Sequence, residues 1–146
     1  MLSVRKILIL KKVPLFKDMT ADALSILSSI AEEKVFGKSN QVFEKGDQGS
    51  SLYIIIDGSI RIHDAYDVQK ASKTLAILKE GDFFGELSIL GNESRSASAT
   101  AVDDSVLLEI GQEPFHRMLM ENFDLSKNLI STLADRIRQL TNKLQD

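Results

Sequence analysis

The sequence contains no cysteine among its 146 residues. This absence excludes disulfide bonds, metal sites built from thiolates and a cysteine nucleophile. It does not by itself fix the compartment, but a chain without disulfides fits the cytosol. We therefore expect a cytoplasmic protein.

Long apolar runs are missing from the N-terminal segment MLSVRKILILKK, where charged residues flank an apolar core of only four residues, Ile7 to Leu10. That core is shorter than the apolar region of a signal peptide and far too short to cross a bilayer. We expect a short helix that packs on the domain, with no direct insertion into a membrane.

The chain also lacks a strong excess of charge of one sign, since 18 Lys and Arg stand against 21 Asp and Glu, giving a net charge of −3. This balance gives no chain-wide attraction to nucleic acid or to an anionic membrane, so any bound anion must meet a local site. The length, with 43% hydrophobic and 27% charged residues, is typical of one globular domain with a real core.

Residue patterns that carry catalysis are missing as well. The two histidines, His63 and His116, lie far apart, and neither has a second ligand-type residue at metal spacing. Each is interpreted as an exposed or hydrogen-bonded polar residue. The sequence has neither a Gly-x-Ser-x-Gly motif nor a glycine-rich phosphate loop with its lysine. We predict that the chain is not an enzyme and holds no metal or cofactor.

Hydrophobic spacing divides the chain into three zones. Residues 6–31 have helical spacing, with Thr20 as the predicted N-cap of a helix. Residues 33–110 form short apolar or alternating runs separated by Gly and Asp turns, which is typical of an antiparallel sandwich or roll. Helical spacing returns at Glu113, where Pro114 suits the first turn of a helix. We predict one domain, 1–146, with N-terminal helices 1–31, a β roll 32–111 and C-terminal helices 112–146.

Six apolar residues near the C-terminus follow a heptad pattern, with Ser126 as a polar interruption. The pattern predicts either a coiled-coil seam or a helix face that packs on the β roll. It is too short to decide between these two structures. The six residues are Phe123, Ile130, Leu133, Ile137, Leu140 and Leu144.

The stretch FGELSILGNESRSASAT, residues 84–100, places Glu86 and Arg95 nine residues apart among mostly small or apolar neighbours. Gly85 allows a ligand to come close, and a helical turn over 86–90 would present free N–H groups to an anion such as phosphate. Arg95 can grip the same phosphate with two N–H donors.

Two small residues after the arginine, Ser96 and Ala97, leave room for a ligand, and Ser96 offers a hydroxyl donor. Glu86 repels phosphate when ionised, but it can accept a hydrogen bond from a sugar hydroxyl. One acceptor and one cation along a row of small residues therefore suit a sugar phosphate.

The same stretch resembles the phosphate-binding cassette of the cyclic nucleotide-binding domain family. The family pattern is approximately Phe-Gly-Glu-Leu-(Ala/Ser)-x-Leu, a short spacer, and Arg-(Ala/Ser/Thr)-Ala-(Ser/Thr), and residues 84–90 and 95–98 fit it throughout. Upstream, VFEKGDQGSSLYIIIDGSIRI resembles the strand-turn-strand of the family, with Gly46, Gly49 and Gly58 at the expected turns. The resemblance covers nearly the whole chain.

The resemblance implies a mainly β fold, a jelly-roll-like antiparallel β barrel (a double-stranded β-helix) with flanking helices, which binds cAMP or cGMP. It implies that Glu86 binds the ribose 2′-hydroxyl and that Arg95 binds the cyclic phosphate. Within the cassette, 84–98, the predicted ligand-binding residues are Phe84, Gly85, Glu86, Leu87, Ser88, Arg95, Ser96 and Ala97.

The resemblance also implies how the signal leaves the domain. The last helix would cover the base and transmit occupancy. The heptad seam, read from the residues themselves, would instead pair two chains through 123–144 if it forms a coiled coil. Ser96 bears on base choice, because the family tends to carry Ala there in cAMP-selective members and Thr in cGMP-selective members. Arg-Ser-Ala also occurs in a cAMP-responsive member, so cAMP is favoured.

Two functions remain open at this point. One is a cyclic-nucleotide sensor that regulates an effector domain or protein outside this chain. No helix-turn-helix pattern follows the cassette, so we expect no nucleic-acid partner. The alternative is the same fold without ligand binding, used for protein interaction or dimerisation. Loss of binding usually shows at the Glu or Arg position, and both Glu86 and Arg95 are present.

Overall fold

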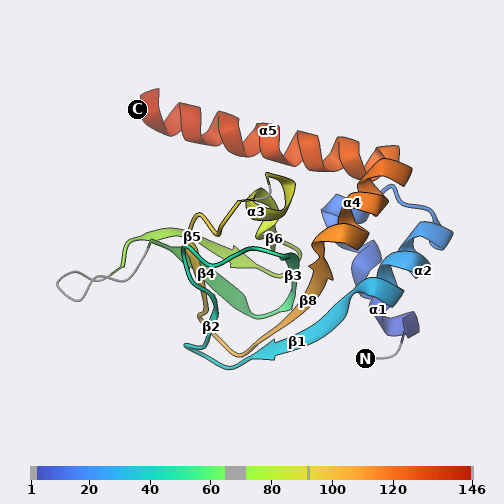
Figure 1. Cartoon of the computed structure of the whole chain (residues 1–146), viewed down its shortest axis with the longest axis horizontal. Helices are drawn as coiled ribbons and strands as arrows, with labels where there is room; N and C mark the ends of the chain where they lie inside the picture. Colours follow the sequence, from blue (N-terminus) through green and yellow to red (C-terminus); the bar gives the residue numbers. More distant parts are fainter. Residues whose placement is uncertain (1–2, 65–71, 92, 146) are drawn as a thin grey trace. The chain divides into compact units, whose positions relative to one another are not determined.

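A computed structural model of the chain describes residues 3–64, 72–91 and 93–145 (Figure 1). The chain forms two compact units. The first, which we call the helical unit, comprises Met1–Ser29 and His116–Asp146, and the second, the β unit, comprises Ile30–Phe115.

Helices at both ends of the chain build the helical unit. Thr20 caps one of them as predicted, because its Oγ1 accepts a hydrogen bond from the Ala23 N–H at 3.1 Å. Pro14 opens a short 3₁₀ helix, where its missing N–H is not needed. The helices are α1 (Ser3–Lys11), η1 (Pro14–Phe16), α2 (Ala21–Ile30), α4 (Gln112–Glu121), which begins in the β unit, and α5 (Phe123–Gln145).

The first turns of α5 pack on η1 within the helical unit. Leu125 and Leu129, one helical turn apart, are buried, and Asn128 Nδ2 donates to the Leu15 carbonyl oxygen at 3.3 Å. Most of the predicted heptad residues lie away from this buried side of the helix. Leu133 is half-buried, and the other five are at least 60% exposed: Phe123, Ile130, Ile137, Leu140 and Leu144.

Two four-stranded antiparallel sheets form the β unit, with strand orders β1-β8-β3-β6 and β2-β7-β4-β5. A core cluster that includes Ile55 from one sheet and Ile60 from the other joins the two. This architecture confirms the predicted mainly β roll. The strands are β1 (Glu32–Phe36), β2 (Gln41–Phe43), β3 (Ser51–Asp57), β4 (Ser59–His63), β5 (Thr74–Lys79), β6 (Phe83–Phe84), β7 (Ser98–Ala101) and β8 (Ser105–Gly111).

The central strand β3 explains why the sequence run SLYIIID is almost wholly apolar. It pairs with β8 on one side, where Ile54 lies opposite Leu108, and with the short strand β6 on the other, where Tyr53 lies opposite Phe84. Its first five residues are buried. The predicted helical turn follows β6 as α3 (Glu86–Leu90), which contacts β3 (Figure 1).

His63 is buried, and both of its ring nitrogens are engaged. It is 6% exposed, and its Nδ1–H donates to the Asp64 carbonyl oxygen while Nε2 accepts from Thr100 Oγ1. The interpretation of His63 as a hydrogen-bonded polar residue is confirmed. In the described part of the chain, no three His, Asp or Glu side chains gather to hold a metal ion. Nor does any helix there have the length and apolar character needed to cross a membrane.

Candidate anion-binding site

The site begins where β6 turns into α3 at Gly85. This residue has φ +87°, a conformation that favours glycine. A Cβ here would also lie 2.7 Å from Arg95 Nη1 and 3.1 Å from the Ser51 carbonyl oxygen. Gly85 is therefore required both by the turn and by the close approach of the arginine.

The Arg95 side chain reaches into this turn and is only 5% exposed. Its Nη1 donates to the Gly85 carbonyl oxygen at 3.0 Å and to Ser88 Oγ at 2.8 Å, and its Nη2 donates to the Ser51 carbonyl oxygen at 2.8 Å. A guanidinium has five N–H donors. Two of them therefore make no hydrogen bond to the described part of the chain.

Arg95 is buried without an ion pair to any carboxylate in the described ranges. Burial lowers the pKa of its guanidinium from the ordinary value, against the opposing influence of Tyr53 and Glu109. A buried cation is unfavourable unless an anion or a set of hydrogen bonds compensates it. Here the protein supplies three hydrogen bonds but no paired anion, so the chemistry of the site suits a bound anion.

Aromatic rings hold the guanidinium on one side. Arg95 Cζ lies 4.2 Å from the centroid of the Phe43 ring and 5.8 Å from that of Tyr53, within the range of a cation–π interaction. The Phe43, Tyr53 and Phe84 rings are neighbours, with centroids 5.4 to 6.0 Å apart. The aromatic cluster therefore fixes the plane in which Arg95 presents its donors.

The Tyr53 hydroxyl connects this aromatic cluster to a carboxylate by a hydrogen bond. It donates to Glu109 Oε2 at 2.7 Å. Burial raises the pKa of Tyr53 well above its ordinary value, and the hydrogen bond to Glu109 raises it further. Tyr53 is therefore neutral at physiological pH and does not serve as the counter-charge for Arg95.

The backbone of Arg95 is held by the turn that precedes β3. Its N–H donates to the Asp47 carbonyl oxygen at 2.7 Å, and its carbonyl oxygen accepts from the Gly46 N–H at 2.9 Å. These two hydrogen bonds fix the main chain at Arg95, independently of its side-chain contacts.

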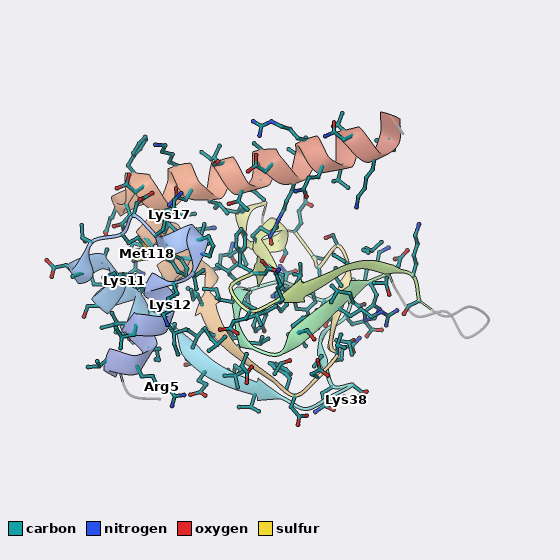
Figure 2. All side chains as sticks on the ribbon, turned by 180° about the vertical axis from the view of Figure 1, so that it is seen from behind. Arg5, Lys11, Lys12, Lys17, Lys38 and Met118 are labelled. Atoms are coloured by element: carbon teal, nitrogen blue, oxygen red, sulfur yellow. The ribbon has the colours of Figure 1, made fainter. Side chains whose placement is uncertain are left out.

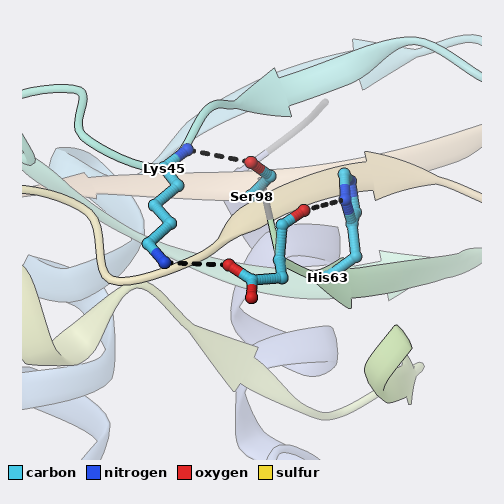
Figure 3. A network of polar contacts seen from close by, with 4 residues as sticks. Lys45, His63 and Ser98 are labelled. Atoms are coloured by element: carbon cyan, nitrogen blue, oxygen red, sulfur yellow. Dashed lines mark hydrogen bonds and ion pairs between the residues drawn. The ribbon is translucent and has the colours of Figure 1, made fainter. Parts of the chain in front are cut away.

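The same turn is tied to the strands beside it (Figure 3). The Lys45 N–H donates to Ser98 Oγ at 2.9 Å, and Lys45 Nζ forms an ion pair with Asp64 at 2.8 Å. His63 donates to the Asp64 carbonyl oxygen. The ion pair is about half exposed and contributes little stability, so the backbone bond to Ser98 is the stronger tie.

Gly49 lies against α3 and Arg95. Its φ lies outside the left-handed region, but a Cβ would lie 2.1 Å from Ser88 Oγ and 3.1 Å from Arg95 Nε. The absence of a side chain here lets this loop approach α3 and leaves the Nε edge of the guanidinium uncovered by residue 49.

The structure brings several predicted site residues together. Hydrogen bonds join Gly85, Ser88 and Arg95, and Glu86 is 5% exposed at the start of α3. The others are placed as follows: the Phe84 ring lies in the core cluster, Ser96 is exposed and Ala97 half-buried in the bend before β7, and the side chain of Leu87 lies outside the described part.

Three further residues belong to this site although the sequence did not single them out as ligand contacts. They are Phe43, Gly49 and Ser51. Ser51 contributes only its main-chain carbonyl oxygen, and Gly49 matters because it has no side chain. Neither residue therefore has a side-chain role that the sequence could reveal. Phe43 stood in the strand-turn-strand pattern, but only the fold reveals its contact with Arg95.

Known proteins are similar to this chain over most of its length. The chain is 31% identical over 130 residues to the cyclic AMP receptor protein of Thermus thermophilus, covering 89% of this chain and 60% of that protein. It is 27% identical over 120 residues to the cGMP-dependent protein kinase egl-4 of Caenorhabditis briggsae, covering 82% of this chain and 16% of that protein. The chain thus spans less than two thirds of each of these relatives.

A solved structure is similar over the same region. The crystal structure of Thermus thermophilus catabolite activator protein matches with a TM-score of 0.80 and 30% identity, over 90% of this chain and 62% of that one. The family model described as cyclic nucleotide-binding domain matches residues 33–122, which include the whole site. The chain belongs to the cyclic nucleotide-binding domain family.

Proposed function

We propose that the chain is a regulatory module, without catalytic activity of its own, that binds a 3′,5′-cyclic nucleotide at Arg95. The observation that carries this proposal is the buried guanidinium, which has no paired carboxylate in the described ranges and retains two unused N–H donors there. A cyclic phosphate has one negative charge and can accept both hydrogen bonds. Glu86, buried beside Gly85, supplies an acceptor for the ribose 2′-hydroxyl.

For the base, we favour cAMP over cGMP. The Arg95-Ser96-Ala97 sequence is compatible with cAMP. The cyclic AMP receptor protein of Thermus thermophilus and the CRP-like cAMP-activated global transcriptional regulator of Mycobacterium tuberculosis, 30–31% identical over 89–94% of this chain, are both named for cAMP. The kinase relatives named for cGMP match 82% of the chain at 24–31% identity. Ser96 is exposed in the bend before β7 and remains available to a ligand.

The output of the module is assigned to α5. This helix exposes five apolar residues in heptad spacing, a surface suited to pairing two chains through 123–144. Nucleotide occupancy would be transmitted through α5 if its alternative packing positions differ in affinity for the nucleotide. The receiver is an effector domain or protein in the cytoplasm, outside residues 1–146.

Thermal unfolding with and without nucleotide tests the binding function. Ligand at about one hundred times its dissociation constant should add ~2.7 kcal/mol to the free energy of unfolding. Adenosine, which lacks the phosphate, is the matched control and should add almost nothing. Arg95→Ala should reduce the shift at the same nucleotide concentration to ~1.4 kcal/mol or less, because its affinity is at least about tenfold weaker. If neither cAMP nor cGMP shifts the wild-type transition, the alternative applies, a protein-interaction domain of the same fold.

The base preference has its own test in titration calorimetry. Wild type should bind cAMP more tightly than cGMP, and Ser96→Ala should leave the cAMP affinity nearly unchanged. A wild type that prefers cGMP, together with a Ser96→Ala variant that loses affinity for cGMP alone, would reverse this assignment.

A further inference from the structure

The start of the chain carries a concentration of positive charge that the nucleotide site does not use. Residues 1–19 contain five Lys and Arg and one Asp, so this segment carries +4 whereas the whole chain carries −3. Exposed basic and apolar side chains of this segment define what we call the N-terminal basic face: Val4, Arg5, Leu8, Lys11, Lys12 and Lys17.

Helix geometry places apolar and basic residues of α1 on one exposed strip. Val4 and Leu8 are four residues apart, and Lys11 follows one turn later on the same side. Lys12 lies in the turn directly after α1. Val4 is 71% exposed and Leu8 is 58% exposed, although both are apolar. The other side of α1 is held within the helical unit by contacts with η1 and by a hydrogen bond from Lys6 Nζ to the Ser28 carbonyl oxygen, and Leu10 is fully buried.

The basic residues of this face lack partners of opposite charge. No carboxylate in the described part of the chain forms an ion pair with Arg5, Lys11, Lys12 or Lys17. In the view of Figure 2, these four side chains are labelled over the helical unit, from Arg5 at one end to Lys17 at the other. Their charges are therefore available to an anionic partner.

We propose that the N-terminal basic face docks the protein on an anionic membrane surface. Lipid headgroups attract the four cations, while Val4 and Leu8 enter the boundary between headgroups and acyl chains. With nine residues, α1 lies along the surface and does not cross the bilayer.

The apolar pair and the fixed helix favour a membrane over other anionic partners. A nucleic acid would meet the cations through its phosphates and leave Val4 and Leu8 without a matching surface. A protein groove commonly surrounds a bound helix on several sides. Because contacts with η1 and Ser28 hold α1 against its own unit, α1 offers one exposed strip, which fits a flat surface.

Sedimentation of the full chain with lipid vesicles tests this proposal. Binding should occur to phosphatidylcholine vesicles containing phosphatidylglycerol, be lost with phosphatidylcholine alone, and weaken as salt is added. Lys11→Gln with Lys12→Gln should lower the partition coefficient roughly 30-fold, from the loss of two interfacial charges. Val4→Ser with Leu8→Ser should also weaken binding, because it removes the apolar contact.

The matched control is Lys38→Gln with Lys79→Gln, which changes the net charge equally but affects exposed lysines of the β unit. It should bind vesicles as wild type does. Equal binding to both vesicle types, no binding to either, or an equal loss in the control variant would overturn the proposal. So would tighter binding to a duplex oligonucleotide or a polyglutamate peptide than to vesicles, which would assign the face to a different class of partner. Circular dichroism confirms that each variant is folded.

Discussion

Arg95 rests on the face of Phe43, with its guanidinium carbon 4.2 Å from the ring centroid. The two residues come from different parts of the β unit, since Phe43 ends β2 and Arg95 precedes β7. A ring in this position stabilises the charge and orients the plane of the guanidinium without using any of its N–H donors. We therefore treat Phe43 as a positioning residue for the anion site.

Replacing this ring should weaken nucleotide binding through Arg95. Phe43→Leu should raise the dissociation constant roughly 3- to 30-fold, from the loss of a cation–π contact of about 0.5–2 kcal/mol. Titration calorimetry measures the change. The control is Phe36→Leu, the same substitution at a partly buried ring packed on the same core cluster, and it should have little effect on affinity.

A double-mutant cycle separates positioning from direct ligand contact. In an Arg95→Ala background, Phe43→Leu should cause almost no further loss, because the group that it positions is gone. A second loss of the same size in that background would show that Phe43 acts independently of Arg95.

Glu86 and Arg95 should differ in how much each contributes to nucleotide affinity. Arg95→Ala removes charge-assisted bonds of ~1.5–3 kcal/mol each and should weaken binding roughly ten- to several hundred-fold. Glu86→Ala should lose less, because the ribose contact is one hydrogen bond while the phosphate carries the only full charge of the ligand. Equal or reversed losses in calorimetry would mean that the two roles are wrongly assigned.

Gly49 should tolerate no side chain. In Gly49→Ala the new Cβ would collide with Ser88, which must move away from Arg95. We expect a loss of about 1–3 kcal/mol in the free energy of unfolding, together with weaker nucleotide binding. Gly111→Ala is the control, since a Cβ there lies 3.6 Å from Pro114, an ordinary contact. Denaturant unfolding that ranks the two variants equally would contradict the steric argument.

Tyr53 should make the fold sensitive to alkali. Its pKa is raised in the folded state by burial and by the hydrogen bond to Glu109, so above about pH 10 the unfolded chain loses this proton while the folded chain keeps it. The unfolded state then binds fewer protons, and stability falls as pH rises. Below about pH 10, the full contribution of Tyr53 to the free energy of unfolding is present.

Urea unfolding of wild type and Tyr53→Phe across this range provides the measurement. The advantage of the wild type, which comes from the Tyr53–Glu109 hydrogen bond, should shrink as pH rises above about 10. A constant difference between the two proteins at all pH values would show that the tyrosine ionises equally in both states.

The exposed heptad residues of α5 should control the oligomeric state. Ile137→Glu with Leu140→Glu should convert a dimer to a monomer in analytical ultracentrifugation, because it places charge in the predicted seam. Ile26→Glu, at an exposed apolar position on α2, should leave the dimer intact. A monomeric wild type would exclude the seam. Substitution is preferable to deletion of 124–146, which would remove the buried Leu125 and Leu129.

Local signals in the sequence predicted much of the fold. The change of hydrophobic spacing located the helical ends and the β middle, and Thr20 marked the start of α2 because an N-cap acts within three residues. The helical turn 86–90 was predictable from another local signal, its position directly after Gly85. The strand β6 could not be predicted from the sequence, since its two residues, Phe83 and Phe84, are too few to show any alternation.

The charged residues of the site could be predicted from the sequence, but the residues that position Arg95 could not. Glu86 and Arg95 stand out in the sequence because charged residues are unusual among small and apolar ones. The Ser51 carbonyl oxygen carries no such signal, since every residue has one. The partnership of Phe43 with Arg95 depends on how distant strands pair, which only the folded chain specifies.

The lack of a paired carboxylate beside Arg95 in the described ranges also affects the stability of the ligand-free protein. A buried cation without a counter-ion lowers the free energy of unfolding, and hydrogen bonds to the charge offset part of that loss. Removing the arginine would not simply relieve this cost, because Gly85, Ser88 and Ser51 would each lose a hydrogen-bond donor. Under the proposed function, the phosphate of the nucleotide supplies the missing counter-charge, so the free protein carries at Arg95 a strain in stability that binding would relieve, and the glycines at 49 and 85 leave room for this guanidinium.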